Sequence, residues 1–110
     1  MDVHDVVLDI DIDGTIARQE SEDYGSNTIL PGVVDWVNKQ KSNGCYIVFR
    51  TGRSWDDYNV TREMLDDAGF EYDELICGKP VGLKTIYMDD KEIRAITVKR
   101  NGGLSGVQVA

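Results

Sequence analysis

Two aspartates, Asp11 and Asp13, follow a run of apolar residues and come directly before Gly14 and Thr15. Such a run is typical of a strand buried in a parallel sheet. Two carboxylates held close together repel each other, and partial burial raises the free-energy cost of each charge. A divalent metal ion commonly balances such a pair, so this stretch indicates a metal site at the end of a strand.

Polar residues also follow three later apolar runs. They are a Thr-Gly-Arg triplet, a lysine and an acidic pair, namely Thr51, Gly52, Arg53, Lys79, Asp89 and Asp90. Parallel sheets bind their ligands where the carboxyl ends of the strands meet. We therefore expect these side chains to gather around Asp11 and Asp13, where an ammonium group and a metal ion would balance the clustered acids.

The segments that must position these residues alternate between strand and helix patterns. Apolar runs predict strands near residues 5–12, 45–49, 75–77 and 83–88, with a further short one at 95–98. Helical spacing of apolar residues predicts helices over residues 31–43 and 54–68. This alternation predicts an α/β fold, a three-layer sandwich with a mainly parallel sheet, in a single domain spanning residues 1–110.

The order and spacing of the motifs resemble those of the haloacid dehalogenase (HAD) superfamily of phosphotransferases. The first motif of that family, Asp-x-Asp-Gly-Thr, matches residues 11–15. The second, an apolar strand ending in Thr or Ser, matches Thr51, and the third, a lysine, matches Lys79. The fourth, an acidic pair, matches residues 89–90. The resemblance implies a Rossmannoid, HAD-like phosphatase of the small capless type with Mg²⁺ as its cofactor.

The resemblance assigns catalytic roles to four side chains. Asp11 would be the nucleophile and also a metal ligand, giving an aspartyl-phosphate intermediate. Asp13 would give its backbone carbonyl to the metal, and its side chain would protonate the leaving oxygen and then activate water. Thr51 would offer its hydroxyl to a phosphoryl oxygen, and Lys79 would neutralise the nucleophile and the transferring group.

Other residues would bind Mg²⁺ or the substrate. Magnesium takes oxygen ligands and binds through one or two carboxylates together with phosphate. The resemblance implies Asp89 as a side-chain ligand, and Asp90 as a ligand through water or as a group that orients the lysine. Backbone N–H groups of Ile12 and Gly52 could complete the phosphate cradle. Arg53 lies beside that cradle, where its guanidinium could clamp a second anionic group.

The chain departs from the family's pattern at Asp9, which lies two residues before the expected nucleophile. The family usually has an apolar or small residue there. We expect Asp9 to pair with Lys99, Arg94 or Arg100, or to be protonated.

The sequence has no room for a cap domain over the cleft. Neither residues 17–30 nor the stretch between the second and third motifs can hold a folded domain of roughly 50 residues. The cleft should therefore be open. Residues 17–30 acting as a flap, or a homo-oligomer, could then serve as its lid.

Composition limits the partners and the compartment. The formal net charge of −8 at pH 7 argues against nucleic acid or an anionic membrane as the partner. No apolar run reaches the roughly 20 residues that span a bilayer, and the acidic N-terminus lacks a signal-peptide pattern. Cys45 and Cys77 lie in apolar runs and are expected to be reduced core thiols. We therefore expect a cytoplasmic protein.

Three functions are compatible with these observations. The first is a Mg²⁺-dependent phosphomonoesterase acting on a small sugar phosphate or related metabolite. The second is a polynucleotide 3′-phosphatase, because the phosphatase unit of end-healing kinases also resembles this chain; it would require a basic stripe at the cleft, formed by Arg53, Arg62, Lys99 and Arg100. The third is a non-catalytic HAD-like module that binds a phosphorylated ligand, which would not need Asp13 as an acid.

Overall fold

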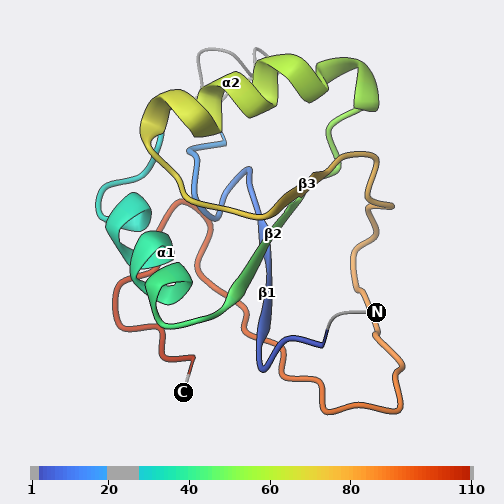
Figure 1. Cartoon of the computed structure of the whole chain (residues 1–110). Coiled ribbons are helices and arrows are strands. Elements are labelled where there is room, and N and C mark those ends of the chain that lie inside the picture. Colours follow the sequence, from blue (N-terminus) through green and yellow to red (C-terminus); the bar gives the residue numbers. More distant parts are fainter. Residues whose placement is uncertain (1–2, 20–27, 110) are drawn as a thin grey trace.

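Three strands and two helices alternate along the first two thirds of the chain. Figure 1 shows the computed structural model, in which residues 3–19 and 28–109 are described. The elements are β1 (Val7–Asp11), α1 (Val33–Ser42), β2 (Tyr46–Arg50), the short 3-10 helix η2 (Trp55–Asp57), α2 (Tyr58–Ala68) and β3 (Glu74–Ile76). The predicted α/β class is confirmed, and the described residues form no cap domain.

The strands form one parallel sheet in the order β1-β2-β3. Asp11 at the end of β1 lies opposite Arg50, and Arg50 in turn lies opposite Ile76 in β3. All three strands therefore end at the same edge of the sheet. The loops that follow them carry the first three motifs, which explains why residues far apart in the sequence can meet there.

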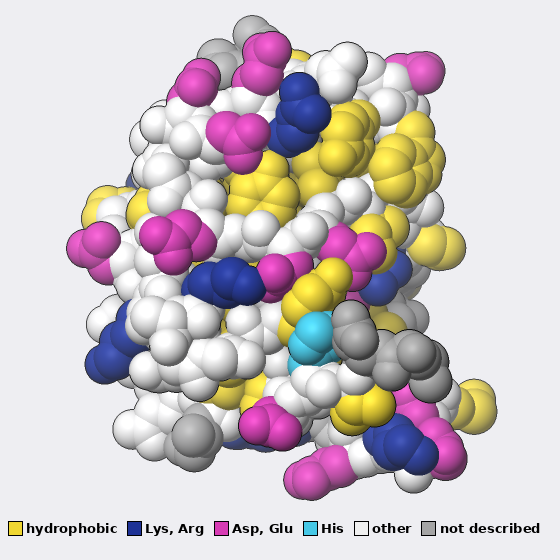
Figure 2. Space-filling model, viewed as in Figure 1, with side chains coloured by type: hydrophobic (Ala, Val, Ile, Leu, Met, Phe, Trp, Pro, Cys, Tyr) yellow, Lys and Arg dark blue, Asp and Glu magenta, His cyan; other side chains and the backbone are white. Residues whose placement is uncertain are grey.

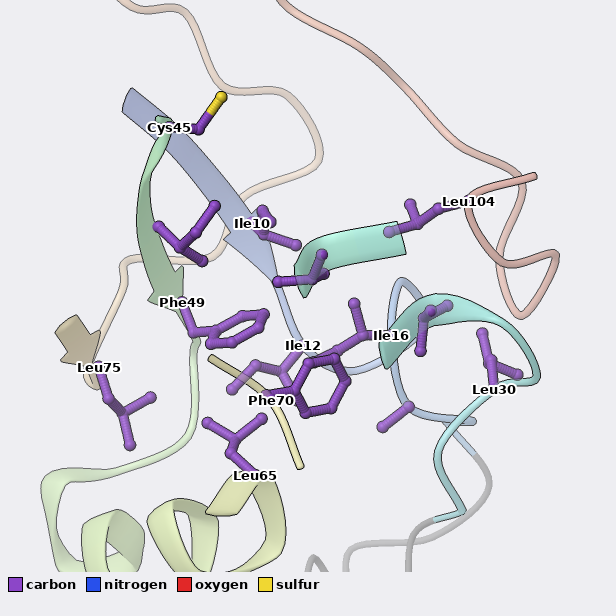
Figure 3. Close-up of a cluster of buried hydrophobic side chains, with 14 of the residues drawn as sticks. Ile10, Ile12, Ile16, Leu30, Cys45, Phe49, Leu65, Phe70, Leu75 and Leu104 are labelled. Carbon is purple, nitrogen blue, oxygen red and sulfur yellow. The ribbon is translucent and has the colours of Figure 1, made fainter. Parts of the chain in front are cut away.

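Alternate strand residues build the core on one face of the sheet. Side chains one residue apart point to opposite faces, so Ile10, Ile47, Phe49 and Leu75 share a face. Figure 3 shows these strands contributing to a cluster with Leu65 of α2 and with residues from the loops after β1 and α2. Buried residues of α1 belong to the same cluster. Both helices therefore cover one face of the sheet.

The opposite face of the sheet carries charged and aromatic side chains. Asp9 accepts a hydrogen bond from Arg50 Nε at 2.8 Å, and both side chains are about one third exposed. The expected partners of Asp9, namely Lys99, Arg94 and Arg100, were therefore wrong. Asp9 lies opposite Val48, and Arg50 ends the neighbouring strand two residues further along, so its side chain lies on the same face as Asp9 and within reach of it.

The expected strands at residues 83–88 and 95–98 are not formed in the described structure. Residues 80–98 make no backbone–backbone hydrogen bonds with other described residues, and the apolar side chains of Leu83, Ile86 and Met88 are exposed. A strand of a parallel sheet needs cover on both faces. No helix follows β3 in the described chain, so pairing with β1 would not bury these side chains. The second outer layer of the expected sandwich accordingly contains no described helix.

The C-terminal segment returns to α1 and closes one end of the core (Figure 1). Leu104 is buried and points into the cluster in Figure 3. The indole N–H of Trp36 donates to the carbonyl of Val107 at 3.2 Å. These contacts anchor a segment that has no strand or helix of its own, and they bring residues 99–103 close to the loop after β1.

Three further expectations concern the flap, the cysteines and the membrane. Most of the expected flap, residues 20–27, lies outside the described part of the chain. Cys45 and Cys77 are both buried and free, as expected for core thiols, and burial raises the pKa of the Cys77 thiol. None of the described helices has the length and apolar character needed to cross a membrane.

Candidate active site

Asp11 and Lys79 form an ion pair at the carboxyl edge of the sheet. Lys79 Nζ lies 3.1 Å from Asp11 Oδ1, and the Asp11 side chain is 40% exposed. The other carboxylate oxygen accepts a hydrogen bond from Thr15 Oγ1 at 3.2 Å. A threonine four residues along the chain and a lysine after the third strand thus fix the orientation of a carboxylate that solvent can still reach.

A tight turn after β1 holds this carboxylate in place. The Ile12 carbonyl accepts hydrogen bonds from the N–H groups of Thr15, Ile16 and Ala17 at 2.9–3.1 Å. Gly14 has φ of 88°, in the left-handed region that residues with a Cβ disfavour. The Gly14 N–H donates to the Ala17 carbonyl at 2.7 Å. The Asp-Gly-Thr sequence therefore forms the sharp turn that its residue types predict.

The loops after β2 and β3 are tied together beside Asp11. The Lys79 N–H donates to the Thr51 carbonyl at 2.9 Å, and the Gly78 N–H donates to the Arg53 carbonyl at 2.7 Å. Gly78 has φ of 75°, so the turn that presents Lys79 favours glycine. These two hydrogen bonds hold the loops together, and both Thr51 and Lys79 line the same cavity.

That cavity has a volume of about 340 Å³ and is lined by Asp11, Asp13, Thr51, Gly52 and Lys79, among others. The Gly52 N–H has no hydrogen-bond partner within residues 3–19 and 28–109. Ile12, in contrast, has a fully buried side chain and does not line the cavity. A residue with an unpaired amide N–H, a residue with a hydroxyl and a lysine that line one space can together bind a small oxyanion.

Arg53 is buried and pairs with Asp13. Its Nε donates to Asp13 Oδ2 at 2.9 Å and its Nη2 to Asp13 Oδ1 at 2.7 Å, a two-point pairing of guanidinium and carboxylate. Nη1 donates to Thr61 Oγ1 of α2 at 3.1 Å. The Arg53 side chain is 1% exposed. Sequence reasoning expected Arg53 to clamp a second anionic group, but its buried guanidinium is hydrogen-bonded to both carboxylate oxygens of Asp13.

The acidic pair of the fourth motif does not line the 340 Å³ cavity that Asp11 lines. Asp89 accepts a hydrogen bond from the Lys91 N–H at 3.0 Å and lines a second, larger cavity of about 740 Å³ that also contacts Asp11 and Lys79. Asp90 accepts a hydrogen bond from Lys91 Nζ at 2.9 Å on the surface, and that hydrogen bond lowers the pKa of the Asp90 carboxyl. The structure brings Asp89 to the same cavity as Asp11, while Asp90 points to a lysine.

The acidic side chains of the site offer carboxylate oxygens, the type of ligand that Mg²⁺ prefers. Within residues 3–19 and 28–109, no three acidic, histidine or cysteine side chains are grouped to hold a metal ion. Magnesium keeps several waters and binds through one or two carboxylates plus phosphate oxygens, so it does not need such a group. Asp11 is exposed enough to supply one carboxylate, and Asp89 lines a cavity that Asp11 also lines.

Thr61 and Arg100 also belong to the site, and sequence reasoning named Arg100 at the cleft only as part of the basic stripe of the polynucleotide 3′-phosphatase alternative. Thr61 is fully buried and supports the Arg53 guanidinium. Arg100 lines the 340 Å³ cavity although it lies near the C-terminus. A small polar residue such as Thr61 can accept a hydrogen bond from a buried donor. Which donor it meets depends on how α2 packs against the loop after β2, and the sequence does not show that packing. No local pattern in the sequence marks Arg100.

The comparisons with known proteins indicate a shared fold. No protein-family model and no curated protein matches the chain. The crystal structure of a target protein from Vibrio cholerae superposes with a TM-score of 0.63 at 27% sequence identity, covering 81% of this chain and 83% of that one. A chain of the Pnkp1/Rnl/Hen1 complex superposes with a TM-score of 0.59 at 20% identity, covering 73% of this chain and 30% of that one. Both likenesses agree with the small α/β architecture.

Proposed function

We propose that this protein is a magnesium-dependent phosphomonoesterase of the HAD superfamily that acts on a small phosphorylated metabolite. The observation that carries the proposal is the contact of Lys79 Nζ with Asp11 Oδ1 at 3.1 Å. The carboxylate and the ammonium group both line one cavity, together with Thr51 and Gly52, and this supports a role for Asp11 as the nucleophile. A carboxylate can approach an anionic phosphate only where cations screen both groups.

In this proposal Asp11 attacks phosphorus and forms an aspartyl phosphate. The bond from phosphorus to the leaving oxygen breaks, and that oxygen takes a proton from Asp13. The Thr51 hydroxyl and the Gly52 N–H donate to the transferring phosphoryl group, and Lys79 balances its charge. A water molecule then attacks phosphorus, Asp13 accepts its proton, and Asp11 is regenerated with release of inorganic phosphate.

Magnesium would add charge neutralisation of the phosphoryl oxygens. Asp11 would hold it through one carboxylate oxygen, the Asp13 carbonyl would be a further ligand, and Asp89 and Asp90 would contribute directly or through water. The oxygen donors and the exposure of Asp11 support this assignment. Asp89 and Asp90 lie on a segment without helix or strand, so their contributions call for a test of their own.

Hydrolysis of an aryl phosphate tests the proposal. The purified protein should release phosphate from p-nitrophenyl phosphate in magnesium, and a chelator should abolish the reaction. Asp11→Asn should lower kcat by at least about a thousandfold, since the amide cannot act as the nucleophile. A variant rate close to that of the wild type would show that the covalent mechanism is wrong.

Asp9→Asn is the matched control for this substitution. Asp9 lies on the same strand and the same face and lines the 740 Å³ cavity, but neither Asp9 nor its partner Arg50 lines the 340 Å³ cavity. The exposed ion pair that is lost contributes less than about 1 kcal/mol to stability. We expect the control to keep most of the wild-type activity, so a loss in Asp11→Asn alone would belong to the chemistry.

The alternative of a polynucleotide 3′-phosphatase is less well supported. It requires a basic stripe that includes Arg53, yet this side chain is buried against Asp13. On the face seen in Figure 2, Lys and Arg side chains are scattered among acidic, apolar and other side chains and form no continuous stripe. Assays of phosphate release from phosphorylated sugars, nucleotides and 3′-phosphorylated oligonucleotides would separate the two functions, and we expect the sugars or related metabolites to be preferred.

The alternative of a non-catalytic binding module is tested by the same assay. A module that only binds a phosphorylated ligand would release no phosphate from p-nitrophenyl phosphate in magnesium. The remaining expectations are a phosphorylated small molecule as the partner, a homo-oligomer as the other candidate cover for the cleft, and a cytoplasmic location. The two free cysteines fit a reducing compartment.

A further inference from the structure

Arg100 contributes a guanidinium to the 340 Å³ cavity from the C-terminal segment. The residue is exposed and makes no hydrogen bond or ion pair with the described residues of the chain. Arg53, in contrast, is already paired with Asp13, and Lys79 with Asp11. Arg100 is therefore the cation of this cavity that has no described carboxylate partner.

The backbone around Arg100 is held against the loop after β1. The Asn101 N–H donates to the Gly14 carbonyl at 2.8 Å, and the Asn101 side-chain oxygen accepts from the Gln19 N–H at 2.9 Å. Asn101 has φ of 59°, a left-handed conformation that asparagine tolerates better than most residues. A Cβ added to Gly14 would lie 3.4 Å from Arg100 Cγ. The aliphatic part of Arg100 thus packs over the turn that carries Asp11 and Asp13.

The lining of the 340 Å³ cavity offers a second cationic contact besides Lys79. Two carboxylates, those of Asp11 and Asp13, and three cations, those of Arg53, Lys79 and Arg100, line it. Arg53 is paired with Asp13 and Lys79 with Asp11, which leaves Arg100 as the lining cation without a described carboxylate partner. A guanidinium suits carboxylate or phosphate because it can donate two parallel hydrogen bonds.

We propose that Arg100 binds a second anionic group, a carboxylate or a phosphate, on the substrate whose phosphoryl group is held at Asp11 and Lys79. This rests on the proposed function and names its substrate class: phosphomonoesters that carry another negative charge on the leaving group. It also reassigns the role expected of Arg53, whose guanidinium is engaged with Asp13 and Thr61.

Binding of unreactive phosphonates tests this proposal without turnover. Isothermal titration in saturating magnesium would compare ethylphosphonate, 3-phosphonopropionate and ethane-1,2-bisphosphonate, which share a two-carbon unit and differ in the second group. The wild type should bind at least one of the two ligands that carry a second anionic group about tenfold or more tightly than it binds ethylphosphonate. This is the gain expected for one charge-assisted contact. The ligand that gains affinity identifies carboxylate or phosphate as the second group.

Arg100→Gln should reduce this preference to about one. Lys99→Gln is the matched control, because it removes the same charge from the neighbouring exposed residue, which does not line the cavity. The control should keep the wild-type preference. Equal binding of all three ligands by the wild type, no binding of any of them, or a preference that survives Arg100→Gln would overturn the proposal. Hydrolysis of p-nitrophenyl phosphate would still decide the phosphatase assignment independently.

Discussion

The pairing of Arg53 with Asp13 is the residue-scale feature with the greatest consequence for the chemistry. Both carboxylate oxygens of Asp13 accept hydrogen bonds from one buried guanidinium, at 2.9 and 2.7 Å. Thr61 and the sulfur of Met64, both on α2, contact the same guanidinium. The proposed acid is thus oriented by a residue that does not reach the substrate, so Arg53 is a positioning residue.

Arg53→Lys tests this role. Lysine keeps the charge but cannot donate to both oxygens and to Thr61, so Asp13 should lose its fixed orientation. We expect kcat/KM to fall by about tenfold more for alkyl phosphates than for p-nitrophenyl phosphate, because the better leaving group needs less proton transfer. Arg62→Lys, at an exposed position on α2, is the control. An equal loss on both substrates would indicate that Arg53 supports only the fold.

Asp73 is a second residue-scale test, and it concerns stability. Its carboxylate accepts hydrogen bonds from Lys41 Nζ at 2.6 Å and from the Ile47 N–H at 2.8 Å. Burial raises the pKa of Asp73, but the hydrogen bonds from Lys41 and Ile47 outweigh it and hold the pKa below its ordinary value. The ionised form is therefore the one that stabilises the fold, and its contribution is present above the unfolded-state pKa.

Asp73→Asn should lower the free energy of unfolding by about 1–2 kcal/mol at pH 7, since it weakens hydrogen bonds to a charged acceptor. The difference from the wild type should shrink as the pH falls below about 4, because the carboxyl of the unfolded chain is then protonated, and it should vanish once the pH also lies below the lowered native pKa. Urea unfolding at several pH values measures both effects. Asp67→Asn, at an exposed position of α2, should change little at any pH. A difference for Asp73→Asn that grows toward acid pH would contradict the assignment.

At the scale of elements, the parallel sheet sets where chemistry can occur. β1, β2 and β3 end at one edge, and the loops that follow them are hydrogen-bonded to one another. The turn at Gly78 is the critical connection, because it ties the loop after β3 to Arg53 and presents Lys79. Its φ of 75° and the closeness of the Trp55 indole leave little room for a side chain.

Gly78→Ala should therefore impair both stability and activity. The left-handed backbone costs about 1–2 kcal/mol for a residue with a Cβ, and the new Cβ would lie 3.0 Å from Trp55 Nε1. We expect this loss in chemical unfolding, together with a lower kcat/KM as Lys79 shifts. Gly82→Ala is the control, since its Cβ would meet nothing closer than 3.5 Å. Similar behaviour of the two variants would argue against a positioning role for this turn.

At the scale of the whole molecule, the main question is how the segment after β3 serves the site. Residues 80–98 lie outside the sheet, and the cavity of about 740 Å³ separates much of this segment from β1. Asp89 lines that cavity, whereas Asp90 pairs with Lys91 at the surface. The two neighbouring acids therefore differ in their access to Asp11.

This difference predicts unequal effects on the magnesium requirement. Asp89→Asn should raise the magnesium concentration for half-maximal phosphatase activity by about tenfold or more, as expected for the loss of a group at a metal site. Asp90→Asn, its matched neighbour, should have a smaller effect because it acts at most through water. Titration of activity with magnesium would measure both. An equal or larger effect of Asp90→Asn would show that the two roles are reversed.

The amino-acid sequence by itself determined the local structure and the order of the candidate groups. Apolar runs and helical spacing are local features of the chain, so β1, β2, β3 and both helices could be predicted, and Asp-Gly-Thr predicted the turn after β1. The convergence of residues 11–15, Thr51 and Lys79 followed from the rule that parallel strands end at one edge. The contact of Lys79 Nζ with Asp11 Oδ1 at 3.1 Å agrees with this expected convergence.

Only the tertiary structure decided which charged groups pair and which segments leave the sheet. Arg53 could have faced solvent or a carboxylate, and the packing of α2 turned it toward Asp13. Arg100 reaches the cavity because Asn101 is bonded to Gly14, a contact between residues far apart in the chain. The apolar run at residues 83–88 looked like a strand, but strand pairing depends on burial by other elements, which local patterns do not contain.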